Sequence, residues 1–250
     1  MRKIFDSHLH IIDPRFPLIK NHGFLPESFT CEDYRKRVDN LQIVGGAVVT
    51  GSFQGFDQTY LIDALQTLGE NFVGVTQLPY DTSDEDIIEL NNVGVRALRF
   101  NVQRSGNDVL SKLNVFARRV YDLVGWHVEL YIDSKFLPEV TTTLESLPAV
   151  SIDHLGLSNE GLKSLYNLVD RGVRVKATGF GRGNLDIGKT LKSIYAINPS
   201  ALMFGTDLPS TRAKRPYDHS DIELIYSALP TNQAENVLYK NALDWYLTKK

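Results

Sequence analysis

The sequence has little cysteine, no long apolar run and no surplus of basic charge, and each absence excludes a class of protein. Cys31 is the single cysteine among 250 residues, so no intrachain disulfide can form, which fits a reducing compartment. No apolar run approaches the ~18 residues that a membrane span requires. The 27 lysines and arginines are outnumbered by 30 aspartates and glutamates. No basic cluster stands out, which argues against a nucleic-acid-binding protein.

The N-terminus also lacks the apolar core of a secretion signal. Asp6, His8, His10 and Asp13 interrupt the segment where that core would lie. We therefore expect a cytoplasmic protein. A chain of this length buries roughly three quarters of its unfolded surface, so its core needs no disulfide or metal. Any metal that the protein binds would serve chemistry.

Short segments rich in Val, Ile and Phe recur along the chain, each followed by a polar turn and a stretch with helical spacing. The expected strands are residues 3–11, 46–53, 72–78, 95–102, 127–132, 150–155, 173–180 and 202–208. The expected helices include residues 60–68, 84–90, 109–124, 160–169 and 187–194, with a closing helix at 232–246.

This alternation indicates parallel strands joined by crossover helices. Eight units of about 31 residues each, with no linker between them, predict a single-domain (β/α)8 barrel, the TIM barrel, over residues 1–250. An open doubly wound sheet is the alternative, but the phosphate fingerprint that such a sheet often carries is missing after the first strand. Residues 10–29 are expected to form a loop over the barrel mouth.

The pattern Asp6-x-His8-x-His10 lies at the end of the first expected strand. Side chains alternate across a strand, so we expect these three to project on one face, which in a barrel points inward. Two neutral imidazoles placed in this way can both reach one divalent cation or one substrate oxygen. The alternative is a pair of surface histidines at a strand end.

The eighth expected strand ends in FGTDLP, which puts the carboxylate of Asp207 at the rim where barrel active sites lie. Strands eight and one are neighbours in a closed barrel, so Asp207 should converge with His8 and His10. Alone, a Thr-Asp pair is more often a helix cap. His154 ends the sixth strand and is the third histidine predicted for the site, whereas Asp153 should point the other way.

Arginines at the strand ends predict an anionic substrate, because their forked guanidinium groups match carboxylates. Arg99 lies at the end of the fourth strand and Arg182 follows the seventh. We expect both to bind substrate, together with Tyr131 at the end of the fifth strand. The remaining arginines near strands and loops are interpreted as solvated charges: Arg96, Arg104, Arg212 and Arg215.

The motifs DSHLHIID, VRALRFN, DHLG, VKATGFGR and FGTDLP, in this order, resemble the amidohydrolase superfamily. More narrowly they are similar to the amidohydrolase-related branch (amidohydrolase 2) that includes 2-pyrone-4,6-dicarboxylate lactonases and sugar-acid lactonases. The resemblance extends from Asp6 to about Tyr246. It implies a TIM-barrel hydrolase of the carboxylic-ester type.

The sequence departs from the superfamily pattern at two strands. Many members bridge two metals through a Lys or Glu on the fourth strand and place a His on the fifth. Here the fourth strand offers Arg99, His127 opens the fifth strand at the wrong end, and the rim carries Tyr131 and Asp133. A binuclear site is therefore not expected. Some lactonases of the branch work without metal, so the resemblance leaves two possibilities: no metal, or one Zn²⁺ or Mn²⁺ on His8, His10 and Asp207.

The predicted reaction is the hydrolysis of a cyclic ester that bears a carboxylate. Asp207 would deprotonate the attacking water while His8, His10 and His154 stabilise charge on the carbonyl oxygen. Two alternatives remain. One is a metal-dependent decarboxylase, although the histidine that such enzymes use as a ligand on the fifth strand is absent here. The other is a non-catalytic barrel that binds small acids.

Some residues are set aside from the site. His22 and His219 lie in polar loops and are expected to be exposed. Phe24, Phe53 and Trp126 are either an apolar wall for a substrate ring or core packing.

Overall fold

Eight parallel strands in consecutive order form the centre of the protein in the computed structural model, which describes residues 2–102 and 108–248. The strands are β1 (Lys3–Leu9), β2 (Gln42–Val49), β3 (Phe72–Thr76), β4 (Val95–Phe100), β5 (His127–Leu130), β6 (Val150–Ile152), β7 (Arg174–Ala177) and β8 (Leu202–Phe204). The predicted (β/α)8 barrel is confirmed, and every expected strand overlaps an observed one.

The barrel closes where β1 meets the segment that follows β8. The backbone nitrogen of Asp207 donates to the His8 carbonyl at 2.7 Å, and that of His10 donates to the Leu208 carbonyl at 2.8 Å. This approach requires a glycine at position 205, because a Cβ there would lie 2.6 Å from the His8 nitrogen. The closure therefore brings the first and last strand ends, with their histidines and aspartate, into one place.

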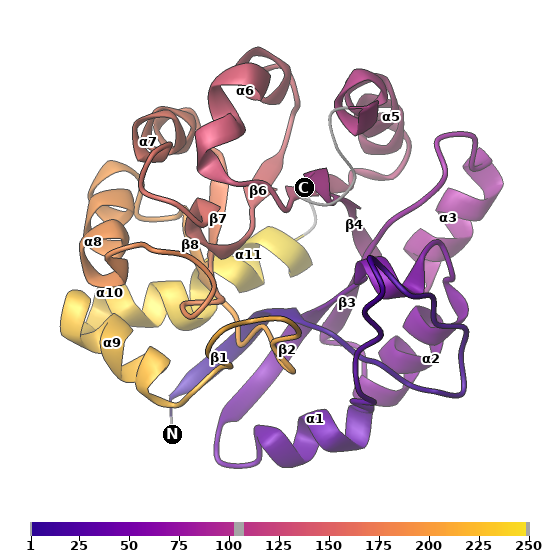
Figure 1. Cartoon of the computed structure of the whole chain (residues 1–250), viewed down its shortest axis with the longest axis horizontal. Coiled ribbons are helices and arrows are strands. Elements are labelled where there is room, and N and C mark those ends of the chain that lie inside the picture. The colour runs from indigo at the N-terminus through magenta and orange to yellow at the C-terminus, as the bar shows by residue number, and fades with distance from the viewer. Residues whose placement is uncertain (1, 103–107, 249–250) are drawn as a thin grey trace.

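Helices surround the strands (Figure 1). Their bounds are α1 (Cys31–Arg37), α2 (Thr59–Leu68), α3 (Asp84–Asn92), α5 (Asp108–Val124), α6 (Leu137–Glu145), α7 (Leu162–Asp170), α8 (Ile187–Ile197), α9 (Ser220–Ala228), α10 (Thr231–Glu235) and α11 (Asn241–Leu247). Short 3-10 turns follow three strands: η1 (Ser52–Gln54), η2 (Ser134–Phe136) and η3 (His154–Gly156). None of the helices within the described ranges is long and apolar enough to cross a bilayer.

Two apolar layers hold the barrel together. The larger lies between strands and helices and contains, for example, Val48, Leu98 and Leu130. The smaller fills the barrel interior, where Phe5, Val75 and Met203 pack with Ala242 and Tyr246 of α11. Because α11 packs onto these interior side chains, it closes the end of the barrel at which the strands begin.

Some expected elements differ in detail. The closing helix predicted at 232–246 is interrupted by a π-helical turn, η4 (Asn236–Lys240), between α10 and α11. Residues 10–29 contain neither a helix nor a named strand, as expected, and Ile12 pairs with Phe29 in an isolated bridge. Helix α1 starts directly after this loop with a capping box between Thr30 and Asp33.

Candidate active site

A register shift in β1, between Asp6 and Leu9, changes which side chains enter the barrel. The Asp6 carboxylate accepts a hydrogen bond from Tyr34 of α1 at 3.0 Å, and from the nitrogen and hydroxyl of Thr206 at 2.8 and 2.7 Å. The prediction that Asp6 shares a face with His8 and His10 is wrong, because a bulge adds a residue and reverses the alternation. Asp6 ties β1 to α1 and to the end of β8.

His8 and His10 both present their Nε2 atoms to Asp207, each at 3.8 Å from Oδ1. Both imidazoles are buried. The Nδ1 atom of His10 lies 2.6 Å from the Val49 carbonyl, which can only accept, so Nδ1 carries the proton and Nε2 carries a lone pair. His10 therefore faces the centre as a hydrogen-bond acceptor.

His154 and Asp207 enter the same space from backbone conformations that non-glycine residues rarely adopt. Their φ angles are 52° and 60°, in the left-handed region, which costs about 1–3 kcal/mol per residue. Such conformations cluster at functional sites. Neighbouring Gly179 makes room for the His154 ring, since a Cβ there would lie 2.6 Å from Nδ1.

The nitrogens of His8 and His154 and an oxygen of Asp207 lie within 4.8 Å of one another, and all three residues are buried. The sequence predicted a metal site on His8, His10 and Asp207. The structure instead brings His154 together with His8 and Asp207. The role of His10 as a ligand stays a prediction. His8 Nε2 and Asp207 Oδ1 have no hydrogen-bond partner among the described residues, and two imidazoles with a carboxylate suit Zn²⁺ or Mn²⁺. The donor set thus fits one divalent cation.

Asp153 also points into the barrel, contrary to expectation. Its Oδ2 accepts from Arg99 Nη2 at 3.0 Å, and its Oδ1 lies 3.4 Å from His8 Nδ1. The strand alternation places Asp153 inward, while the left-handed backbone of His154 turns the next side chain inward as well. Both residues of the pair therefore reach the centre.

A buried ion pair below the histidines was not predicted. Lys176 of β7 contacts Glu129 of β5, and both side chains are fully buried. Glu129 also accepts hydrogen bonds from Tyr246 and His127. Each of the two charged residues lies between outward-facing apolar neighbours, such as Val175 and Ala177 around Lys176. The strand period of two could have identified both as inward-facing.

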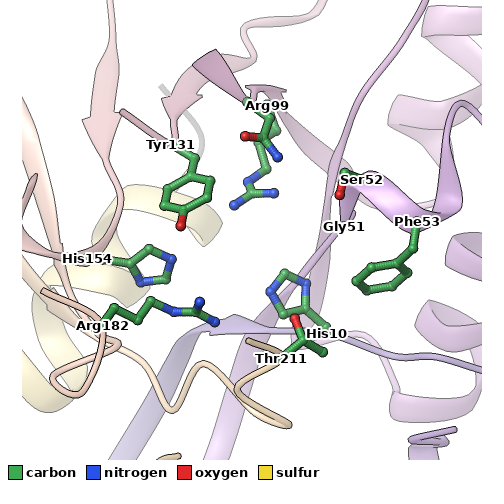
Figure 2. Close-up of a pocket in the computed structure, with 10 residues that line it drawn as sticks. His10, Gly51, Ser52, Phe53, Arg99, Tyr131, His154, Arg182 and Thr211 are labelled. Carbon is green, nitrogen blue, oxygen red and sulfur yellow. The ribbon is translucent and has the colours of Figure 1, made fainter. Parts of the chain in front are cut away.

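Above the histidines, a cleft of about 310 Å³, measured with its open mouth, holds the predicted substrate contacts. Figure 2 shows Arg99, Tyr131 and Arg182 directed toward the same space as His10 and His154. Part of each arginine is already bound, since Arg99 Nη1 donates to the Thr50 carbonyl at 2.9 Å and Arg182 Nε to Asp207 Oδ2 at 2.6 Å. The cleft is small, cationic and lined by polar groups.

Burial and the surrounding cations keep the histidines neutral. Burial, together with Lys176, holds the pKa of His8 well below its usual range. Burial and Arg182 do the same to the pKa of His154, and burial with Arg99 lowers the pKa of His10 to about 3. Burial raises the pKa of Asp207, although Arg182 opposes this. A carboxylate with a raised pKa among neutral imidazoles is suited to take a proton.

The residues set aside from the site behave in different ways. His22 and His219 are exposed, as expected. Phe53 lines the cleft, whereas Trp126 is buried in the core and donates to Asn91. His127 lies at the opposite end of the barrel, against Trp245 and Tyr246. Phe24 packs under the guanidinium of Arg212, and Arg104 lies outside the described residues.

Known proteins share both the fold and the sequence pattern. A 2-pyrone-4,6-dicarboxylate hydrolase of Comamonas testosteroni is 26% identical, covering 93% of this chain and 86% of its own. A 4-sulfomuconolactone hydrolase of Rhizobium radiobacter is 25% identical over 87% and 80% of the two chains. An Acinetobacter baumannii protein crystallised with citric acid matches with a TM-score of 0.84 at 20% identity, covering 97% and 98%.

The amidohydrolase family model matches residues 5–247, which is nearly the whole chain. The match includes all eight strands except the first residues of β1, together with His8, His10, His154 and Asp207. The family expected from the motifs is thereby confirmed, and this chain belongs to the amidohydrolase family.

Proposed function

We propose that this protein hydrolyses a lactone that carries a carboxylate or a similar acid group. The observation that carries the proposal is the position of Asp207. One of its oxygens is bound by Arg182, while the other faces the buried histidines without a hydrogen-bond partner in the described parts of the chain. The names of the relatives, a pyrone dicarboxylate hydrolase and a sulfomuconolactone hydrolase, support the same substrate class.

In the proposed reaction, Asp207 Oδ1 takes a proton from the water that attacks the lactone carbonyl. The Nε2 lone pair of His10 lies 3.8 Å from the same oxygen and can hold the water in place. His8 and His154 face the carbonyl oxygen on which negative charge develops. The ring C–O bond then breaks, and the leaving oxygen takes the proton that Asp207 received.

The two arginines of the cleft recognise the acid group. Arg99 is oriented by Asp153, and Arg182 by Asp207, so both guanidinium groups are held before substrate binds. Such preorganisation reduces the entropy that is lost on binding. Tyr131 lines the same cleft. Its ring centre lies 5.5 Å from Arg99 Cζ, and the ring is edge-on to His154, so we assign it to the same contact.

The His8, His154 and Asp207 set would hold a single divalent cation. When bound, such an ion polarises a carbonyl and lowers the pKa of its water to about 7. The arginines and Tyr131 keep the same role in either case. The expected partner is a small anionic molecule, and no step above depends on nucleic acid or membrane.

A proton-release screen of carboxylate-bearing lactones tests the proposal, with metal content and CO₂ measured on the same sample. We expect one proton for each ring opened and no CO₂. Release of CO₂ would instead indicate the decarboxylase, and tight binding without turnover across the panel would indicate a non-catalytic barrel. Activity that survives chelation in a sample shown to be metal-free would exclude a metal role.

A further inference from the structure

The buried Lys176 has a contact that neither the fold nor the proposed reaction explains. Its ammonium nitrogen lies 3.4 Å from His8 Nδ1 and contacts Glu129, deep in the barrel interior. A buried charged pair is costly to form and is often less stabilising than an apolar pair of the same volume. Several other interior positions are apolar, including Val75, Ala97 and Met203. A lysine at this place therefore requires a reason beyond packing.

Lys176 determines which ring nitrogen of His8 carries the proton. An ammonium group only donates, so the nitrogen that it approaches must be an acceptor. A neutral imidazole carries one proton, which must then lie on Nε2. That atom faces Asp207 and the centre of the site.

Asp153 offers the opposite arrangement. Its Oδ1 also lies 3.4 Å from His8 Nδ1, and it can only accept. A hydrogen bond from Nδ1 to Asp153 would leave a lone pair on Nε2. The geometry favours Lys176, because its ammonium forms a hydrogen bond with Nδ1, whereas Asp153 Oδ1 receives no hydrogen bond within the described residues.

The two arrangements give the centre different chemistry. With the proton on Nε2, His8 donates to a substrate oxygen and cannot ligate a metal through that atom. With the proton on Nδ1, Nε2 can ligate a metal, in the way that ligating histidines are usually fixed by a partner on their other nitrogen. His10 already presents its lone pair, since its Nδ1 donates to Val49. His8 and His10 therefore face Asp207 with opposite hydrogen-bonding capacity.

We propose that Lys176 is a positioning residue that holds His8 as an Nε2–H donor, and that this contact opposes divalent-metal binding at His8. Metal binding requires His8 to exchange Lys176 for Asp153 as the partner of Nδ1. The inference deepens the proposed function, because it assigns His8 to the developing charge on the substrate oxygen. It also predicts that the binding of metal is coupled to a residue that is not a ligand.

The test compares the native protein with the double variant Lys176→Met/Glu129→Gln. This variant removes one positive and one negative charge, so the net charge near the site is unchanged, and no buried charge is left unpaired. Glu129→Gln alone is the matched control, because it keeps Lys176. Long-range ¹⁵N–¹H correlation spectra report the protonated nitrogen of His8, which is assigned by its absence in His8→Gln. Titration with zinc alone reports metal affinity.

We expect Nε2–H for His8 in the metal-free native protein and Nδ1–H in the double variant. Zinc affinity of the double variant should rise about tenfold or more over Glu129→Gln, the range typical of changes in groups that contact a metal ligand. Nδ1–H in the native protein, or a double variant with unchanged tautomer and zinc affinity, would overturn the proposal. Neither measurement uses substrate, so failure of the lactone screen and failure of this inference are distinguishable.

Discussion

Arg182 Nε lies 2.6 Å from Asp207 Oδ2, while Oδ1 of the same carboxylate has no hydrogen-bond partner among residues 2–102 and 108–248. One oxygen is therefore fixed and the other is available to chemistry. The arginine orients the carboxylate and opposes the rise in its pKa that burial causes. This division of roles leads to the first prediction.

Asp207→Asn keeps the shape of the side chain and removes the base. We expect kcat to fall by about 100-fold or more, the usual effect of losing a general base. Asp133→Asn is the control, because Asp133 lies at the same rim but binds Lys135 and Ser158 instead. A loss of less than about tenfold in Asp207→Asn would reject the assignment of the base.

Arg99→Ala should weaken substrate binding more than it slows turnover. Arg99 is held by Asp153 and Thr50 and faces the cleft. Loss of a charged hydrogen bond of about 1.5–3 kcal/mol should raise KM about 10- to 100-fold, with kcat changed only a few-fold. Arg96→Ala on the same strand is the control, since Arg96 lines a separate cleft with His127 and should leave KM unchanged. An unchanged KM in Arg99→Ala would refute the carboxylate contact.

Asp6 should make the stability of the fold depend on pH. Burial raises the pKa of Asp6 from 3.8 to about 6, although Thr206, His8 and Tyr34 oppose the shift. The folded protein thus binds this proton more tightly than the unfolded chain. The resulting stabilisation is present below pH 4 and is lost as pH rises through 6.

Urea unfolding at pH 4 and pH 7 measures this effect. The shift corresponds to roughly 3 kcal/mol as an upper value. The free energy of unfolding should differ between the native protein and Asp6→Asn, and this difference should change by an amount of that order between pH 4 and pH 7. The native protein should be more stable relative to the variant at pH 4 than at pH 7. A difference independent of pH would contradict the prediction.

Tyr246→Phe tests the hydrogen bond that Tyr246 donates to the buried Lys176–Glu129 ion pair. The Tyr246 hydroxyl donates to Glu129. Burial tends to raise the pKa of Glu129, but Lys176 and His127 outweigh burial, so the pKa is lowered overall. Removing the hydroxyl leaves a buried carboxylate oxygen with one donor fewer, which should cost about 1–3 kcal/mol in the free energy of unfolding. Tyr239→Phe, on the adjoining π-helical turn and only partly buried, should change the same free energy by less than about 0.5 kcal/mol. Equal effects of the two substitutions would argue against the hydrogen bond.

Much of the site could be predicted from the ends of the strands. Apolar runs of Val, Ile and Phe that end in a polar residue placed His8, His10 and Asp207 at the correct rim, because parallel strands all end at the same face of a barrel. The same logic placed Arg99 and Tyr131 in the cleft. These predictions needed only the period of the strand and the order of the elements.

The predictions for Asp6 and Asp153 failed because they assumed that regular alternation continues to the end of each strand. A bulge in β1 reverses the alternation at Asp6, and a left-handed residue after β6 turns His154 inward beside Asp153. Neither event has a clear local signal, since both depend on how neighbouring strands and turns pack. The inward orientation of Glu129 and Lys176, in contrast, follows from the alternation, because their neighbours along the strand are apolar and face outward.

The sequence by itself determined the number and order of the strands, the rim that carries the chemistry and the family, because these follow from periodicity and from motifs along the chain. Only the tertiary structure decided how the charges pair. The contacts of Lys176 with Glu129 and His8 join residues 47 and 168 positions apart. Such pairs form when the barrel closes and removes water from its interior, where a buried charge is stable only beside a partner.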